Sequence, residues 1–300
     1  RSLFPELLQL TSLSDYKGKV LSLLVTLVDS NIIKAQEYEN YFSKIYFDAK
    51  IELKKQRLKD EKIMEKEIVK DENAAGGRNY NYFTDDKANL YEYSVLLLPF
   101  YTKNNNVPSF FEHLLQSKEP DVRLNTAVLL LRNNLPVADS ILLNLAATDQ
   151  YRSRLFSELE KAKRLDKFPA TYKNQIDIAR SYLVADKNYD KVDSIVFLLK
   201  QPAAYQGKKG TVYFFKYRVK KEDDWKIGIS GLQPENEKNI SSDDELTSMT
   251  GKKIKPDEPL DVQLQKQLKK ILFSFHNSGK NFYGYNDYES SVRSFDEFEN

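Results

Sequence analysis

Cysteine is absent from the 300-residue chain, and histidine occurs only as His113 and His276. Without cysteine there is no disulfide, no thiolate nucleophile and no Cys-based metal site, and the redox compartment stays open. Each histidine lies in an amphipathic helical stretch without an identifiable partner for a Ser-His-Asp triad. We therefore interpret both as surface or boundary side chains, not as catalytic bases.

Short catalytic and cofactor-binding signatures are missing as well. The sequence contains no P-loop, G-x-G-x-x-G, H-E-x-x-H, EF-hand loop or G-x-S-x-G. Acidic clusters such as Asp85-Asp86, Asp223-Asp224 and Asp243-Asp244-Glu245 fall in expected turns, where turn formation explains them better than metal binding. We expect no catalytic residue, cofactor or metal, and we interpret the chain as not itself an enzyme.

Long apolar runs and a dominant charge are also lacking. No run approaches the ~18 apolar residues that a membrane span needs, so we expect a soluble domain, cytoplasmic or of the cell envelope. Lys plus Arg number 46 against 44 Asp plus Glu, a net charge of +2, which does not favour a nucleic-acid partner. The chain opens at Arg1 without a methionine or leader, so we expect a piece of a longer, multidomain protein.

Ample apolar surface is present, with 41% hydrophobic and 12% aromatic residues, so the chain can form an ordered core. Helical periodicity with short polar links predicts two units: a helical domain over 1–187 and a small domain over 188–300 that ends in an aromatic tail. The tail either wraps back on its domain or forms a recognition strip. We expect two helices over 3–33. One further helix is expected over each of 34–71, 87–101, 107–116, 120–133, 136–146, 151–164 and 171–185.

An internal repeat links three of the helix pairs. In each, the second helix opens with Asp, then an apolar or aromatic residue, then a basic one: Asp15-Tyr16-Lys17, Asp121-Val122-Arg123 and Asp149 to Arg152, the last with one extra residue before Arg152. An Asp at this position can cap the helix and favour its positive end. The pattern over 107–159 resembles the HEAT-like α-helical repeats, which implies an irregular α-solenoid.

After Asn188 the period changes from helical to alternating, beginning with an expected strand at Val192. The pattern predicts a three-stranded antiparallel meander whose middle strand carries Tyr213, Phe215 and Tyr217 on its apolar face. A polar connection over 234–256 leads to a last helix, which we expect to cover that face. The fold class is therefore mainly α, a HEAT-like solenoid followed by a small α+β unit.

Basic residues supply the candidate contacts. The opposite face of the meander carries Lys216, Arg218, Lys220 and Lys226, which could hold an anionic ligand or be an ordinary solvated face. Concave helix faces near 120–133 and 151–164 would present Arg123, Arg152 and Arg154 to a protein or peptide partner.

A weaker resemblance concerns the whole arrangement. Helical repeats followed by DDWKIGISGLQP over 223–234 look like the C-terminal region of large bacterial proteins whose N-terminal part belongs to the TraB/GumN family. That family's catalytic region carries G-x-x-H signatures, whereas Phe110 and Phe273 stand three residues before the two histidines here. The resemblance implies that any chemistry lies upstream.

We thus predict a non-catalytic scaffold or protein-interaction module. The alternative is an accessory or substrate-binding domain of a hydrolase, with chemistry at the helical-to-β junction around 182–205 or in an upstream TraB/GumN-like domain.

Overall fold

A computed structural model describes residues 3–69, 85–184, 192–205, 207–220, 222–233 and 246–278. The chain forms two compact units, residues 1–141 and 142–300. The sequence predicts the boundary between the two domains at 187/188, where helices give way to strands. In the structure, the boundary between the compact units lies within helix α8 (Asp139–Ala147). The last helices before the sheet therefore belong to the same unit as the sheet. The aromatic tail lies outside the described residues.

The described residues of the first unit form helices joined by short turns, without a strand. Pro120 opens one of its helices at the first position, as predicted, because a proline there loses no hydrogen bond. The helices are α1 (Phe4–Leu10), α2 (Ser14–Asp29), α3 (Ala35–Tyr38), α4 (Phe42–Val69), α5 (Asp85–Leu97), α6 (Asn106–Leu115) and α7 (Pro120–Arg132).

A break at Tyr38 divides the segment for which the sequence predicts one long helix. The φ of Tyr38 is −120°, outside the helical region, and a 3-10 turn over Glu39–Tyr41 leads into α4. The Tyr38 ring stacks on Phe4 with centroids 4.7 Å apart, and its hydroxyl donates to the Leu96 carbonyl oxygen at 3.3 Å. Burial of this ring therefore overrides the helical pattern.

The second unit combines helices with a four-stranded antiparallel sheet of order β1-β2-β3-β4. Among the described helices of the whole chain, none has both the length and the apolar character needed to cross a bilayer. The remaining elements are α9 (Asp149–Lys161), α10 (Gln175–Val184), β1 (Val192–Tyr205), β2 (Lys208–Val219), β3 (Lys226–Gln233), β4 (Ser248–Lys253) and α11 (Leu260–Ser278).

The prediction of three strands is wrong, because β4 lies within the expected polar connection. This strand carries one large apolar residue, Met249, so the alternation that marks a strand is missing from its sequence. Pairing with β3 holds it instead, and the Thr250 hydroxyl donates to the Ile227 carbonyl oxygen at 2.7 Å. An edge strand held by main-chain pairing leaves little trace in the sequence.

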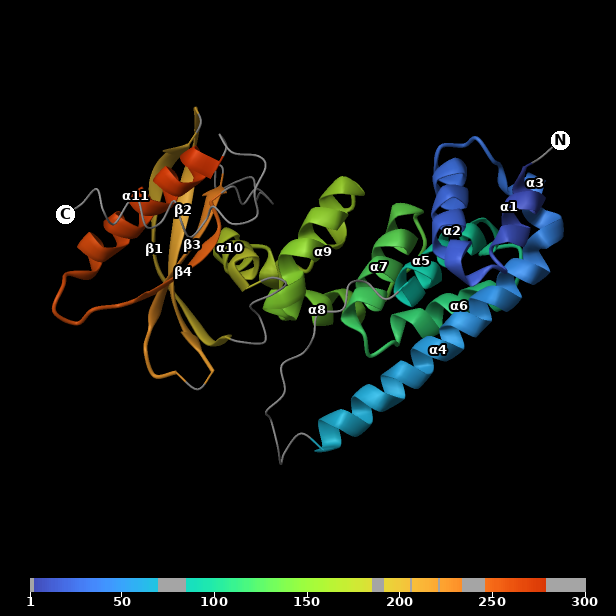
Figure 1. Cartoon of the computed structure of the whole chain (residues 1–300), viewed down its shortest axis with the longest axis horizontal. Helices are drawn as coiled ribbons and strands as arrows, with labels where there is room; N and C mark the ends of the chain where they lie inside the picture. The colour runs from blue at the N-terminus through green and yellow to red at the C-terminus, as the bar shows by residue number, and fades with distance from the viewer. Residues whose placement is uncertain are drawn as a thin grey trace. The chain divides into compact units, whose positions relative to one another are not determined.

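A helix lies on each side of β2, α11 on one side and α10 on the other (Figure 1), and both faces of the strand are buried. Val212 and Phe214 pack with Leu268 of α11. Tyr213 and Phe215, which we expected beneath the last helix, pack against α10 on the other face. The sheet of the second unit therefore lies between two helices.

Gly210 in β2 offers a test of this packing. A Cβ there would lie against the Gln233 carbonyl oxygen and the Leu232 side chain of β3, so Gly210→Ala should lower the free energy of unfolding by about 1–3 kcal/mol. Gly18 in α2 is the matched control: a Cβ there meets Asn89 Oδ1 at an ordinary 3.5 Å, and Gly18→Ala should raise this free energy by about 0.5–1 kcal/mol. Urea unfolding followed by circular dichroism measures both. An unchanged midpoint for Gly210→Ala would contradict the packing.

Candidate functional site

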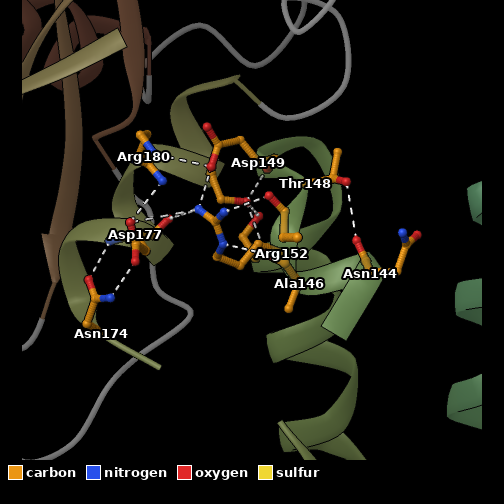
Figure 2. A network of polar contacts seen from close by, with 11 residues as sticks. Asn144, Ala146, Thr148, Asp149, Arg152, Asn174, Asp177 and Arg180 are labelled. Carbon is orange, nitrogen blue, oxygen red and sulfur yellow. Dashed lines mark hydrogen bonds and ion pairs between the residues drawn. The ribbon is translucent and has the colours of Figure 1, made fainter. Parts of the chain in front are cut away.

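Arg152, one of the predicted contact residues, lies in the interior of the second unit. It is the fourth residue of α9 and is 1% exposed. Its Nε donates to the Ala146 carbonyl oxygen at 2.7 Å, and its Nη2 donates to that of Ala147 at 3.2 Å. Figure 2 shows the guanidinium at the C-terminal end of α8. Carbonyls at a helix end lack partners within the helix, and the helix dipole favours a cation there.

Two carboxylates and one ring complete the surroundings of the guanidinium. Asp149 accepts a hydrogen bond from Arg152 Nη1, and Arg180 Nε on α10 donates to the same carboxylate at 3.1 Å. Asp177 pairs with Arg180 Nη2 at 2.9 Å and lies 4.0 Å from Arg152 Nη1. The Tyr172 ring centroid is 4.9 Å from the Arg152 guanidinium carbon. Alternating cations and anions compensate the buried charge and connect α9 to α10.

Short polar contacts fix α10 in this arrangement. Asn174 precedes the helix, and its Oδ1 accepts a hydrogen bond from the Asp177 backbone N–H at 2.9 Å, as an N-cap does. Ser181 Oγ accepts from the Ser153 backbone N–H at 2.8 Å and contacts Ser153 Oγ at 2.9 Å. Serines at this crossing allow the two helices to approach closely.

The burial of Arg152 corrects its assignment as a partner contact. Its donors are directed at carbonyls and carboxylates of its own unit, so the guanidinium is not presented to a partner. The sequence could not reveal this, because an arginine in the first turns of a helix is ordinarily exposed. We remove Arg152 from the contact residues.

Arg123 occupies the equivalent position in α7. It is the fourth residue of that helix, is half-buried, and donates from Nη1 to the Ser117 carbonyl oxygen at 3.2 Å, just beyond the end of α6. Lys17 is likewise the fourth residue of α2, but its Nζ pairs with Glu52 Oε1 of α4 at 2.5 Å. Two of the three sequence repeats thus share an arginine that donates to a backbone carbonyl at or just beyond the end of the preceding helix. In the third repeat, Lys17 instead forms an ion pair with Glu52.

Arg154 and two of the sheet cations remain at least partly accessible. Arg154 on α9 is half-buried. Lys216 Nζ lies 4.6 Å and the Arg218 guanidinium carbon 5.5 Å from the Trp225 ring centroid. Arg218 Nε also donates to both carboxylate oxygens of Asp193, at 3.1 and 3.2 Å. These cations already stack and pair within the sheet, which weakens their attraction for an outside anion.

Lys226 does not lie on the predicted basic face. It pairs with Tyr217 across the β2–β3 ladder, whereas Lys216 pairs with Ile227, and directly paired residues point to the same face. Lys226 is therefore on the opposite face from Lys216, where its Nζ lies 2.6 Å from Glu222 Oε2. Lys220 is exposed just after the end of β2. The predicted face reduces to Lys216, Arg218 and Lys220.

A cluster of buried polar side chains in the first unit escaped the sequence analysis. Glu52 on α4 is 2% exposed, and its Oε1 pairs with Lys17 at 2.5 Å and Lys55 at 3.2 Å. Its Oε2, the Tyr93 hydroxyl and Asn89 Oδ1 are buried without a hydrogen-bond partner among the described residues. The signal that could have revealed Glu52 is its position, three residues after buried Ala49 and so on the packing face of the helix.

Glu92 on α5 adds a titratable group to the same unit. Burial raises the pKa of its carboxyl to about 7, and a hydrogen bond with Ser22 lowers it only in part. Its Oε2 is buried and has no hydrogen-bond partner in the described part of the chain. A carboxyl that titrates near neutrality can transfer protons, although structural clusters perturb pKa values as well.

Residues considered for metal or acid–base chemistry are dispersed. His113 is half-buried in the last turn of α6, and Asp224 pairs with Lys253 at 2.5 Å. Asp85 and Asp86 open α5 instead of forming a turn, while residues 243–245 and the His276 side chain lie outside the description. Across the described ranges, no three His, Asp or Glu side chains are gathered so that they could hold a metal ion.

Fold and contacts together define a mainly helical protein with a small antiparallel sheet. Comparison of the chain with protein-family models, with curated proteins and with solved structures finds no match. The resemblances to HEAT-like repeats and to TraB/GumN-associated proteins therefore stay predictions from sequence motifs. Function has to be argued from the surfaces and contacts themselves.

Replacing Arg152 tests whether its network holds the second unit together. Arg152→Met removes the donor of the α8 carbonyls and one of the two arginines that donate to the Asp149 carboxylate, so the free energy of unfolding should fall by about 3–5 kcal/mol. The control is Lys161→Met on the same helix, whose side chain is 69% exposed beside Glu158 and should cost about 0.5 kcal/mol or less. Thermal and urea unfolding compare the two variants. Equal losses would contradict a structural role for the buried guanidinium.

The Glu92 carboxyl should make the protein less stable as pH rises. The unfolded chain loses this proton near pH 4.5, whereas the folded chain keeps it to about pH 7, so its contribution to stability falls between those values. Glu92→Gln cannot ionise, and we expect it to exceed the wild type in stability at about pH 8 but not at about pH 4. Urea midpoints across this range, with exposed Glu61→Gln as control, measure the difference. A variant that keeps the wild-type dependence would refute this assignment.

Proposed function

We propose that this chain is a non-catalytic scaffold, a HEAT-like helical repeat that binds a protein or peptide partner, with the sheet adding a second contact. The carrying observation is the arginine at the fourth position of α7 and α9. Arg152 donates to carbonyls of the last turn of α8, and Arg123 donates to the Ser117 carbonyl just beyond the end of α6. A repeated contact within helix pairs supports a repeat architecture, and stacked helix pairs offer extended binding surfaces.

Each repeat helix offers partner contacts within its own unit, α7 in the first and α9 in the second. In α7 the side chains are buried or half-buried except for exposed Arg132 at its end. In α9, half-buried Arg154 is followed by exposed Glu160 and Lys161. We therefore assign specificity to these positions together with Arg123. On the sheet, Lys216, Arg218 and Lys220 provide the second contact, suited to an anionic group on the partner.

The hydrolase alternative requires a polar cleft where the helices meet the sheet. There, Leu183 of α10 packs against Tyr213 and Phe215, with Ile195 and Phe197 beside them. Apolar packing at this junction favours the scaffold over chemistry at that place. Activity in an upstream TraB/GumN-like domain would be compatible with a scaffold here.

Charge reversal on the repeat helices tests the scaffold. Arg132→Glu combined with Arg154→Glu should reduce capture of at least one partner about tenfold in a quantitative pull-down from a bacterial lysate, because repulsion replaces attraction at the contact. The matched control reverses Lys19 and Lys34, two exposed lysines of the first unit. If the repeat-helix variant retained every partner that the control retains, the scaffold proposal would fail.

A further inference from the structure

The outer side of α4 carries a second apolar face, opposite the one that packs into the core. Ile45 and Ala49 on the packing face are fully buried. At 100° per residue the outer side chains lie nearly half a turn of the helix away. A surface helix is normally polar on that side. Three large apolar residues occupy it instead: Phe47, 64% exposed, Leu58, 49%, and Ile51, 41%.

The spacing of these residues is that of a coiled-coil seam. Phe47, Ile51, Lys54 and Leu58 follow one another at steps of four, three and four residues, which is the alternation of d and a positions in a heptad. The resulting stripe covers only about 60° of the helix surface, narrower than the ≳100° face of a helix that packs into a core. A narrow seam suits one facing helix better than the broad apolar face by which helices lie on membranes.

The positions that flank the seam are mainly basic. Lys50 and Arg57 stand at the g positions, and Lys55 stands at an e position. Lys50 Nζ lies 5.8 Å from the Tyr46 ring centroid, and Lys55 lies 3.2 Å from Glu52. Within the described residues, neither Lys54 nor Arg57 has a carboxylate partner.

The remaining e positions do not reverse this excess of positive charge. Asp48 is acidic, but its Oδ2 accepts a hydrogen bond from Lys44 at 3.0 Å. Lys62, one heptad after Lys55, is exposed. Since charges at e and g select the partner of a coiled coil, this seam calls for acidic residues opposite.

We propose that this seam, Phe47, Ile51, Lys54 and Leu58, docks an acidic amphipathic helix of another protein. Apolar residues of the partner would cover Phe47, Ile51 and Leu58, and its carboxylates would face Lys54 and Arg57. A second copy of the chain fits poorly, because two basic flanks would meet. The inference goes beyond the proposed function, since it uses neither the α7 and α9 positions nor the sheet.

A designed peptide serves as the probe. A labelled synthetic helix of three heptads, with Leu at a and d and Glu at e and g, is titrated with the full chain and followed by fluorescence anisotropy. The matched peptide carries Lys at e and g. We expect the Glu peptide to bind at least about tenfold more tightly than the Lys peptide, with the difference shrinking as salt rises.

Seam variants locate the site. Ile51→Ser with Leu58→Ser replaces exposed side chains and should weaken binding of the Glu peptide by at least about tenfold. Leu23→Ser with Ile32→Ser is the control, because these side chains are 46% and 67% exposed elsewhere in the first unit. Lys50→Glu with Arg57→Glu should invert the preference toward the Lys peptide. Such an inversion cannot result from unfolding.

Several outcomes would overturn the proposal. Equal binding of both peptides, or binding that survives the seam variants, would remove the seam as the site. Seam-dependent binding to phosphatidylserine vesicles without peptide binding would assign it to a membrane, and a dimer lost in the seam variants would assign it to a second copy. Tighter peptide binding after removal of residues 279–300, which hold five acidic and two basic residues, would assign the seam to the chain's own terminus. The variant Arg132→Glu with Arg154→Glu should bind the peptide normally, so the scaffold and the seam fail separately.

Discussion

Carbonyl groups at the end of one helix must find donors when the next helix folds back over them, and in this protein a buried or half-buried arginine supplies those donors. Arg152 does so for α8, with Asp149 and Asp177 compensating its charge. The same guanidinium, together with the Arg180–Asp149 and Ser153–Ser181 contacts, connects α9 to α10. Because α10 packs on the sheet, these contacts help to set the position of the sheet within the second unit. Arg123 makes a similar contact with the Ser117 carbonyl just beyond the end of α6.

The repeated basic residue near the start of these helices was evident from the sequence, but the contacts that it makes were not. The basic residue at the fourth position of α2, α7 and α9 is visible in the chain, and the helices that carry it follow from periodicity and from Pro120. Whether the basic side chain turns outward or back onto the preceding helix depends on what surrounds it. Tyr38 is a similar case, since its break in the helix follows from a ring that packs on Phe4. Such outcomes require three-dimensional contacts that a local pattern does not contain.

The wrong predictions for the sheet concern how its strands pair with one another. The strands β1, β2 and β3 were predicted because their apolar residues are numerous, whereas β4 has main-chain bonds in place of an apolar pattern. The face of Lys226 was misassigned because alternation within one strand says nothing about register with its neighbour. The failure to predict that both faces of β2 are buried has a similar cause. The apolar residues of β2 are evident in the sequence, but the sequence does not show which helix covers which face.

Helix α4 shows why net charge is a poor guide to partners. Its packing face becomes polar beyond Leu53 without losing burial, since Gln56 is 4% exposed and donates to Asp60 Oδ1 at 2.9 Å. Beyond Leu53 the side chains of this face therefore change from apolar to polar while the face stays buried. The opposite face collects lysines and one arginine around exposed apolar residues, although the whole chain carries only +2. The electrostatic field that could select a partner depends on which face of the helix carries each charged residue. On α4, positive residues gather on one face, although positive and negative charges nearly cancel over the whole chain.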